Sequence, residues 1–213
     1  MTTKKMTTVG ILCGMALVLA LTLYIPIVPA VSFLKYEPKD VVMVVGGFIY
    51  GPMTVVLMSV IVSILEIFFR AGNLLDVIMN VISTVAFAGT AALIYQKKRT
   101  KNGAVLGLSL GVVLTVILML IWNYIVTPIY YQMPREAVVA MMIPGLLPFN
   151  LIKYGMNAGI TLVMYKPIVN VLRRFKMVEG HSGKKDAQKG MVLLGLFVVL
   201  TLVCVIMAMQ GLI

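Results

Sequence analysis

Charged residues are scarce in this chain, and acidic ones are the scarcest. Only 12% of its 213 residues are charged, against the roughly 25% usual in soluble domains, and seven acids stand against eighteen basic residues. With 61% hydrophobic residues and a mean hydropathy of +1.05, the chain is predicted to be an integral membrane protein. Acids this few and this scattered also argue against a proton relay.

Histidine and cysteine are almost missing. The single histidine, His181, lies in a polar stretch, and Cys13 and Cys204 lie in separate apolar runs, so we expect neither a disulfide framework nor a metal site. Walker A, His-Glu-x-x-His and Ser/His/Asp patterns are also absent from the sequence. We therefore expect no enzyme and no ATP hydrolysis. The basic excess comes with no nucleic-acid-binding motif, so no nucleic-acid partner is expected.

Long apolar runs alternate with clusters of basic residues, which predicts an all-α bundle of transmembrane helices. The first run follows two lysines and is too long for a signal peptide, so we interpret it as a retained helix. The apolar runs cover about 6–33, 41–50, 53–69, 75–95, 104–128, 137–172 and 191–213.

The region 41–69 fits either one span or two short helices. A break at Gly51-Pro52 puts Lys4 and Lys5 on the same side of the membrane as the basic cluster at 97–101, as the positive-inside rule favours. The first of the two helices is then too short to span, and we expect its neighbours to enclose it. Gly46-Gly47 within it indicates close approach of another helix or of a ligand.

Basic residues set the predicted orientation and the predicted segments. Thirteen of the eighteen fall on one side: two at 4–5, four at 97–101 and seven at 166–189. This side is predicted to be cytoplasmic, with the N-terminus on it. We expect a six-helix domain over 1–176, a cytoplasmic linker over 177–190 and an additional transmembrane helix over 191–213 that ends outside.

Three polar side chains recur at helical spacing inside the apolar run 137–172. Asn150, Lys153 and Asn157 lie at i, i+3 and i+7, so they occupy one helix face. A lysine at membrane depth costs about 3 kcal/mol or more unless it faces a cavity or a partner. The spacing therefore predicts a site for a polar solute within the bundle.

The segment 32–40 joins the first two helices on the predicted outer side. Pro38 stiffens its approach to the second helix, and Asp40 can cap that helix. The segment is either an ordinary capped loop or a lid whose residues, among them Leu34 and Tyr36, close over a ligand.

Other polar residues lie near the predicted outer helix ends. Asn80 and Asn123 are the better candidates for a binding pocket, because each lies within an apolar helix. Asp76 can cap the fourth helix, and Glu66 lies at the interfacial end of the third.

Small residues four apart mark the first helix. Gly10 and Gly14 are followed by Ala16 and Ala20, a pattern that lets a second helix approach closely. The pattern fits packing within the bundle as well as a face that docks on another subunit.

Four stretches of the chain together resemble the riboflavin-specific S component of energy-coupling-factor transporters. Their order and spacing carry the resemblance over about residues 6–176, whereas the family usually ends before the last helix of this chain. The stretches are Phe-Leu-Lys-Tyr-Glu-Pro-Lys-Asp at 33–40, Gly-Gly-Phe-Ile-Tyr-Gly-Pro at 46–52, Met-Asn-Val-Ile-Ser at 79–83 and Asn-Leu-Ile-Lys at 150–153.

The resemblance implies a six-helix vitamin-binding subunit of the cell membrane, with riboflavin as transported ligand and no covalent cofactor. It implies as partners a membrane-embedded T component and two cytoplasmic ATPases, with Gly10 and Gly14 where the family docks on the T component. Asn150 and Lys153 match binding positions of the family, Asn123 corresponds to another, and the first loop contributes to the site. Lys153 would also suit the phosphate of flavin mononucleotide.

Three other functions remain open from the sequence. The same fold could take thiamine, biotin, folate, pantothenate or a queuosine precursor. An intramembrane enzyme would use Lys153 and Glu66 as catalytic groups. An assembly subunit without a ligand would pair Lys153 with a buried acid such as Glu66.

Overall fold

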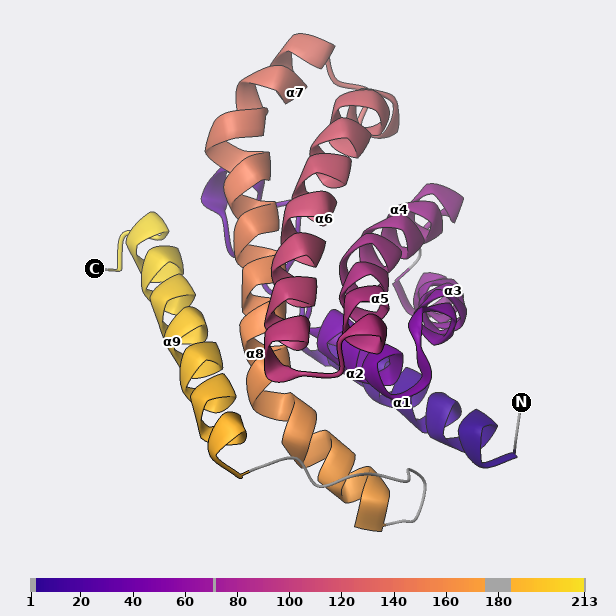
Figure 1. Cartoon of the computed structure of the whole chain (residues 1–213). Helices are drawn as coiled ribbons and strands as arrows, with labels where there is room; N and C mark the ends of the chain where they lie inside the picture. Colours follow the sequence, from indigo (N-terminus) through magenta and orange to yellow (C-terminus); the bar gives the residue numbers. More distant parts are fainter. Residues whose placement is uncertain (1–2, 71, 175–184, 213) are drawn as a thin grey trace.

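A computed structural model describes residues 3–70, 72–174 and 185–212, and in these ranges the chain is a helical bundle without a β-sheet (Figure 1). A lone bridge between Ile25 and Tyr36 ties the ends of the first loop together. The helices are α1 (Thr3–Thr22), η1 (Pro29–Val31), α2 (Lys39–Tyr50), α3 (Pro52–Arg70), α4 (Leu74–Thr84), η2 (Val85–Gly89), α5 (Thr90–Lys97), α6 (Lys101–Tyr130), α7 (Arg135–Met141), η3 (Met142–Leu146), α8 (Leu147–Arg174) and α9 (Lys185–Met209).

The predicted break at Gly51-Pro52 is confirmed. Gly51 has φ of +95°, a conformation that suits glycine, and its N–H donates to the Gly47 carbonyl at the end of α2. Pro52 then starts α3, where its missing N–H has no helical partner to lose. Ten of the twelve residues of α2 are buried, so neighbouring helices enclose this short helix as expected.

The paired glycines of α2 serve close helix packing. A Cβ at Gly46 would lie 2.6 Å from Met58 Sδ, and one at Gly47 would lie 2.5 Å from Val55 Cγ2. Both contacts are with α3, and neither glycine lines the cavity described below. Of the two predicted uses, helix approach is the one that the structure shows.

The described residues form seven helical segments, as the sequence predicts, of which α2 is too short to span a membrane. Six segments of the described chain are long and apolar enough to cross a membrane, and the enclosed helix α2 is the seventh element. Two of the six are composite: α4, η2 and α5 form one segment, and α7, η3 and α8 form another. Pro144 lies in η3, where its lack of an N–H accounts for the wider turn. The chain is thus a multi-pass membrane protein.

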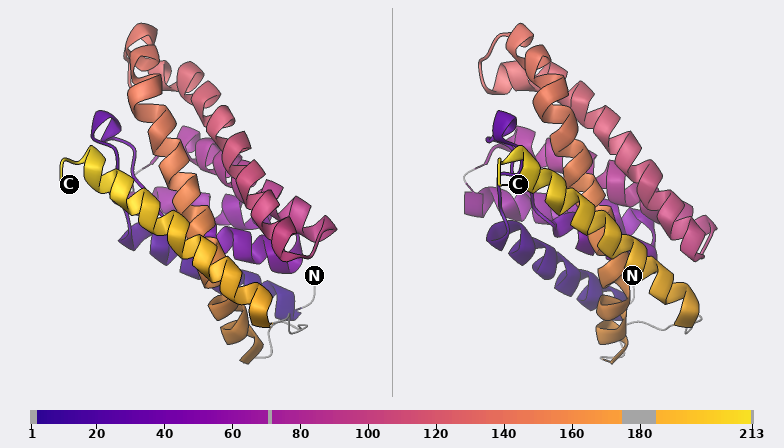
Figure 2. Two further views of the ribbon diagram at one scale, coloured as in Figure 1. Left: turned by 60° about the vertical axis from the view of Figure 1, so that its left-hand side comes forward. Right: turned by 90° about the vertical axis from the view of Figure 1, so that its left-hand side faces the viewer.

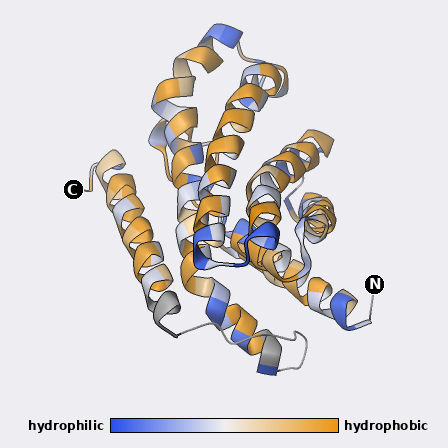
Figure 3. Cartoon of the chain, in the orientation of Figure 1, coloured by the Kyte–Doolittle hydropathy of each residue, from blue (hydrophilic) through white to orange (hydrophobic). Residues whose placement is uncertain are grey.

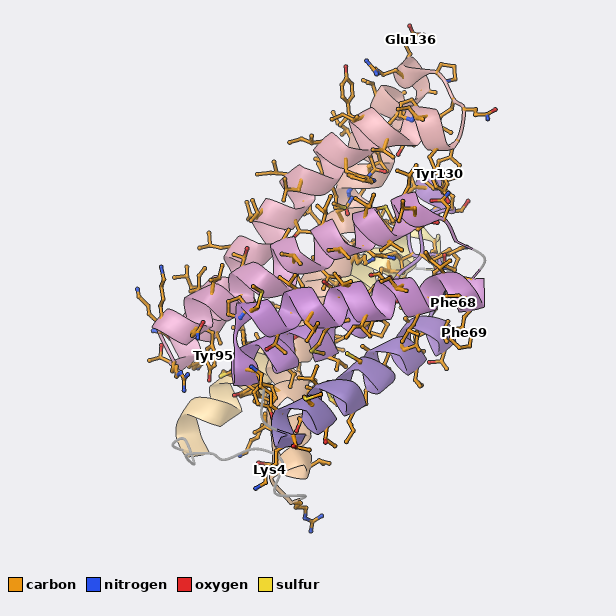
Figure 4. The ribbon with its side chains drawn as sticks, turned by 90° about the vertical axis from the view of Figure 1, so that its right-hand side faces the viewer. Lys4, Phe68, Phe69, Tyr95, Tyr130 and Glu136 are labelled. Carbon is orange, nitrogen blue, oxygen red and sulfur yellow. The ribbon has the colours of Figure 1, made fainter. Side chains whose placement is uncertain are left out.

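The sequence predicts that successive helix connections lie on opposite sides of the membrane, and the arrangement of the helices agrees with this. Figure 4 shows Lys4 and Tyr95 toward one end of the molecule and Phe68, Phe69 and Tyr130 toward the other. Hydrophobic residues cover most of the helix lengths, while hydrophilic ones gather at the α5–α6 turn and at the start of α7 (Figure 3). This distribution is typical of a bundle that crosses a bilayer.

The small residues of α1 divide between two faces. Gly10 and Gly14 are exposed, and a Cβ at either would meet no atom within 4 Å. Ala16 is fully buried in the core, so its predicted place on a docking face is wrong. The reason is helical geometry, because two residues beyond Gly14 the helix has turned by about 200° and points into the bundle.

Helix α9 covers one side of α8. A Cβ at Gly195 would lie 2.6 Å from the Gly159 carbonyl oxygen, so the two backbones nearly touch where the helices cross. The helix lies along α8 in both views of Figure 2, and at its far end Gln210 Nε2 donates to the Pro26 carbonyl at 3.4 Å. It begins at Lys185 rather than at the predicted 191. Most of the predicted linker, including His181, lies outside the described residues.

Gly195→Leu is expected to lower the stability of the full-length protein. The added side chain meets backbone that cannot rotate away, and such overpacking costs about 1–3 kcal/mol. Thermal unfolding in detergent would show the loss as a lower midpoint. Gly10→Leu is the matched control, because the space beside Gly10 is open. Equal midpoints for the two variants would contradict the close crossing.

Candidate ligand-binding site

A cavity of about 270 Å³ opens among the first loop, α3, α4, α6 and α8. This volume is near the lower limit of the range of about 300–1,000 Å³ typical of small-molecule sites. Five of the eight residues predicted to bind ligand line it, namely Leu34, Asn80, Asn123, Asn150 and Lys153.

Asn150 and Lys153 present unused hydrogen-bonding groups to the cavity. The Asn150 amide nitrogen donates to the Leu146 carbonyl at 2.7 Å, and its oxygen has no partner among the described residues. Lys153 is 9% exposed, and its ammonium makes no hydrogen bond to any described residue. The closest acid is Glu37, with Oε1 at 3.7 Å from Lys153 Nζ. A buried donor and acceptor of this kind call for a polar partner within the cavity.

Asn157, Tyr36 and Asp40 do not line the cavity but form a layer beside it. The Tyr36 hydroxyl donates to Asn157 Oδ1 at 3.0 Å, and Asn157 Nδ2 donates weakly, at 3.5 Å, to Asp40 Oδ2 and to the Glu37 carbonyl. Asn157 is completely buried. It lies two helical turns beyond Asn150. At that position along α8, the end of the first loop packs against the helix, so Asn157 faces the loop and not the cavity. These three residues hold the loop against α8.

The predicted capping role of Asp40 is not what the structure shows. Pro38 is the residue before α2, and no side chain caps that end. Asp40 instead accepts a hydrogen bond from the Thr84 hydroxyl at 2.7 Å, which links α2 to α4. Because Asp40 lies within the first turn rather than ahead of it, its carboxylate points across to a neighbouring helix.

Helix α4 begins with a reciprocal cap. Asn73 is the capping residue and accepts from the backbone of Leu75 and Asp76, while the Asp76 carboxylate accepts from the Asn73 N–H at 2.8 Å. Asp76 thus contributes to the cap from the third helical position rather than alone. It also accepts from the Tyr130 hydroxyl at 3.1 Å, which ties α4 to α6 beside the cavity.

The other two predicted amides line the cavity with their groups largely engaged. Asn123 Nδ2 donates to the Met119 carbonyl at 2.7 Å, and Asn123 Oδ1 accepts from the Thr127 hydroxyl at 2.9 Å. Asn80 Nδ2 donates to Glu66 Oε2 at 3.3 Å. Both amides are therefore oriented by their own neighbours.

A buried ion cluster centred on Glu37 forms part of the cavity wall. Glu37 Oε2 lies 2.8 Å from Arg70 Nη1, and Glu37 Oε1 lies 3.0 Å from Lys39 Nζ. Lys39 also lies 2.8 Å from both carboxylate oxygens of Glu66. With Lys153, the cluster connects the first loop to α2, α3 and α8.

Glu37 remains ionised throughout the physiological pH range. Burial favours a raised pKa for the Glu37 carboxyl, but the charges of Lys39, Lys153 and Arg70 outweigh burial and lower the pKa to about 2. A lowered pKa stabilises the folded state above the ordinary value of 4.5, and this stabilisation is lost only as the pH falls toward 2. Glu37 therefore keeps its negative charge at neutral pH.

Comparison with known proteins identifies the family. The family model of the substrate-specific component of ECF transporters matches residues 4–165, about three quarters of the chain. The chain belongs to this family.

Individual relatives agree with the match. The chain is 26% identical over 178 residues to the riboflavin transporter RibU of Staphylococcus aureus, covering 80% of this chain and 93% of the relative. It is 29% identical over 163 residues to the riboflavin transporter FmnP of Bacillus subtilis, covering 72% and 85%. A solved structure of the S component of a bacterial ECF transporter aligns with a TM-score of 0.68 at 26% identity, covering 80% of this chain and 98% of the other.

Membership in this family makes the chain a transporter component, so the expectation that it is no enzyme is confirmed and the intramembrane enzyme is set aside. Helix α9 lies beyond the residues that the family model matches.

Sequence reasoning missed three members of the ion cluster. Glu37 and Lys39 belong to a polar loop sequence of a kind that usually faces water, and Arg70 lies at the end of an apolar run, where an arginine usually reaches water. The available signal was Glu66, the single acid in the apolar helix α3, because an acid at that depth requires a cationic partner.

Lys39→Met is expected to destabilise the S component by about 3–5 kcal/mol, because it leaves Glu66 buried without its cation. The double variant Lys39→Met/Glu66→Gln should lose less than the sum of the two single variants. Thermal unfolding of all three in detergent measures this coupling. Lys97→Met, which removes an exposed lysine, should leave the midpoint unchanged. Additive losses would show that the pair is not coupled.

Proposed function

We propose that this S component captures riboflavin from outside the cell and delivers it inward as part of an ATP-driven transporter. The observation that carries the proposal is the unused hydrogen-bonding capacity of Lys153 and Asn150 at the wall of a cavity within the membrane. The relatives named as riboflavin transporters support the choice of ligand.

The chemistry of the cavity suits a flavin. The isoalloxazine ring is planar and largely apolar, and one edge alternates carbonyl groups with N–H. An amide oxygen such as that of Asn150 accepts from such an N–H, and an ammonium such as that of Lys153 donates to a carbonyl or to the ribityl hydroxyls. Met79, Met119 and Phe149 supply apolar wall for the ring faces. Burial plus a few oriented polar groups accounts for tight capture.

The first loop and the aromatic residues beside it fit a lid over the bound ligand. Phe33, Leu34 and Lys35 line the cavity, and the Phe33 ring lies 4.9 Å from the ring of Tyr131 at the end of α6. Movement of the loop away from Tyr131 would open a path for the ligand.

The positive-inside rule supports a cytoplasmic N-terminus and an outward-facing cavity. Tyr95, two residues before the basic cluster of 97–101, lies at the end of the molecule away from Tyr130, which lines the cavity (Figure 4). This orientation suits uptake, because the ligand enters from outside and the ATPases work in the cytoplasm.

A T component and two cytoplasmic ATPases complete the proposed transporter. Gly10 and Gly14 supply the docking face on α1, because their exposed, side-chain-free surface lets another helix approach closely.

Two other functions predict different results. An S component for another vitamin would bind that vitamin in preference to riboflavin. An assembly subunit needs an acid to pair with Lys153, a condition that Glu37 satisfies better than Glu66, but it has no use for the cavity beside the pair.

Purified wild-type protein is expected to bind riboflavin with one site per chain, detected by quenching of flavin fluorescence. Lys153→Ala and Asn150→Ala should each weaken binding about tenfold or more, because each removes a buried hydrogen-bonding group. Lys97→Ala and Asn102→Ala are the matched controls, since both residues are exposed. Absence of riboflavin binding, or stronger binding of thiamine or biotin, would contradict the proposal.

The double variant Gly10→Leu/Gly14→Leu should bind riboflavin normally and yet fail to copurify with the T component. The two leucines occupy the face that the partner helix needs, and neither glycine lines the cavity. Pull-down from cells that express the whole transporter measures the loss. Normal copurification would show that Gly10 and Gly14 do not form the docking face.

A further inference from the structure

Positive and negative charges are equal in number on the wall of the cavity. Of the residues that the structure describes, three cations and three carboxylates line it, and Lys39 and Asp40 behind the wall add one charge of each sign. The lining cations are Lys35, Arg70 and Lys153, and the lining carboxylates are Glu37, Glu66 and Asp76.

The opposite charges are not only equal in number but also lie close to one another. Glu37 lies within 4 Å of Lys39, Arg70 and Lys153, so a single carboxylate is close to three cations. Glu66 provides the second acid for Lys39. Every buried lysine of the wall and of the layer behind it therefore has a carboxylate at short range.

The charges of the wall are balanced, but some of its hydrogen-bonding groups remain without a partner. Lys153 has Glu37 at 3.7 Å to balance its charge, but its N–H groups make no hydrogen bond to the described residues. Asn150 Oδ1 is a neutral acceptor and is likewise unused. A ligand that brings carbonyl and hydroxyl groups satisfies these atoms, whereas a ligand that brings net charge finds no free buried countercharge among the residues that the structure describes.

We propose that Glu37 is the residue through which this cavity disfavours the phosphorylated form of a flavin relative to the uncharged one. The inference rests on the proposed function and names the substrate class of the same site. A phosphate group carries a charge of about −1.5 to −2 at pH 7, and burying it beside the Glu37 carboxylate without a free cation is costly.

Lys35 does not remove this barrier. It is partly exposed, it belongs to the loop, and it makes no ion pair with the described residues. Its single charge is offset on the wall by Asp76, and an exposed cation interacts with a phosphate less strongly than a buried one because water screens it.

Competitive titration of the full chain with riboflavin and flavin mononucleotide tests the selectivity. The wild type is expected to bind riboflavin about tenfold or more tightly than the mononucleotide. In Glu37→Gln, that ratio should fall about tenfold, because the wall then carries one positive charge in excess. Glutamine keeps the side-chain length and an oxygen that can accept from Arg70.

Asp76→Asn tests the same charge count at a partly exposed position outside the Glu37 cluster, so it keeps the proposal testable if Glu37→Gln does not fold. It should lower the ratio in the same direction by a smaller factor, about threefold. Glu136→Gln is the matched control, because Glu136 is exposed on α7 and does not line the cavity. It should leave the ratio unchanged.

The outcomes separate this inference from the proposed function. If wild type binds neither flavin, the proposed function fails. If wild type binds both flavins equally, or if folded Glu37→Gln or Asp76→Asn retains the wild-type ratio, riboflavin capture stands and selection by charge balance is overturned.

Discussion

The carboxylate of Glu37 is the constraint on which the cavity of this S component depends. It is buried, it remains ionised, and it draws together Lys39 of α2, Arg70 of α3 and Lys153 of α8. A buried ion cluster contributes little net stability compared with apolar packing, but removing one member leaves an uncompensated charge. The cluster therefore specifies how the loop and three helices meet, and with it the shape and charge of the cavity.

The short helix α2 makes this arrangement possible. Because other helices enclose it, its first turn can carry Lys39 and Asp40 into the interior, where lipid would not tolerate them. Its two glycines admit α3, which carries Glu66 and Arg70. The layer of Tyr36, Asp40 and Asn157 then fixes the end of the loop against α8. The break at Gly51-Pro52, predictable from the sequence, is thus the local feature that lets the site assemble.

Helix α9 extends the family's fold on the side of α8. Its glycine crossing with α8 is tight, and at its end Gln210 contacts the Pro26 carbonyl of the first loop. Leu202, Ile206 and Met209 pack beside the apolar cluster that includes Val28 and Tyr36. The additional helix consequently packs against the same loop that lines the cavity. The sequence predicted its existence from hydropathy, but hydropathy carries no information about which neighbour a lipid-facing helix contacts.

The sequence by itself determined the helices, the alternation of their ends and the candidacy of Asn150 and Lys153, because hydropathy, basic clusters and helical spacing are local properties. Only the tertiary structure decided that Glu37 rather than Glu66 lies beside Lys153, that Asn157 supports the loop instead of lining the cavity, and that Ala16 faces the core. These outcomes depend on which segments distant in the chain come within a few ångströms of each other. In a low-dielectric interior such proximity decides the partner of every charge, and no local pattern encodes it.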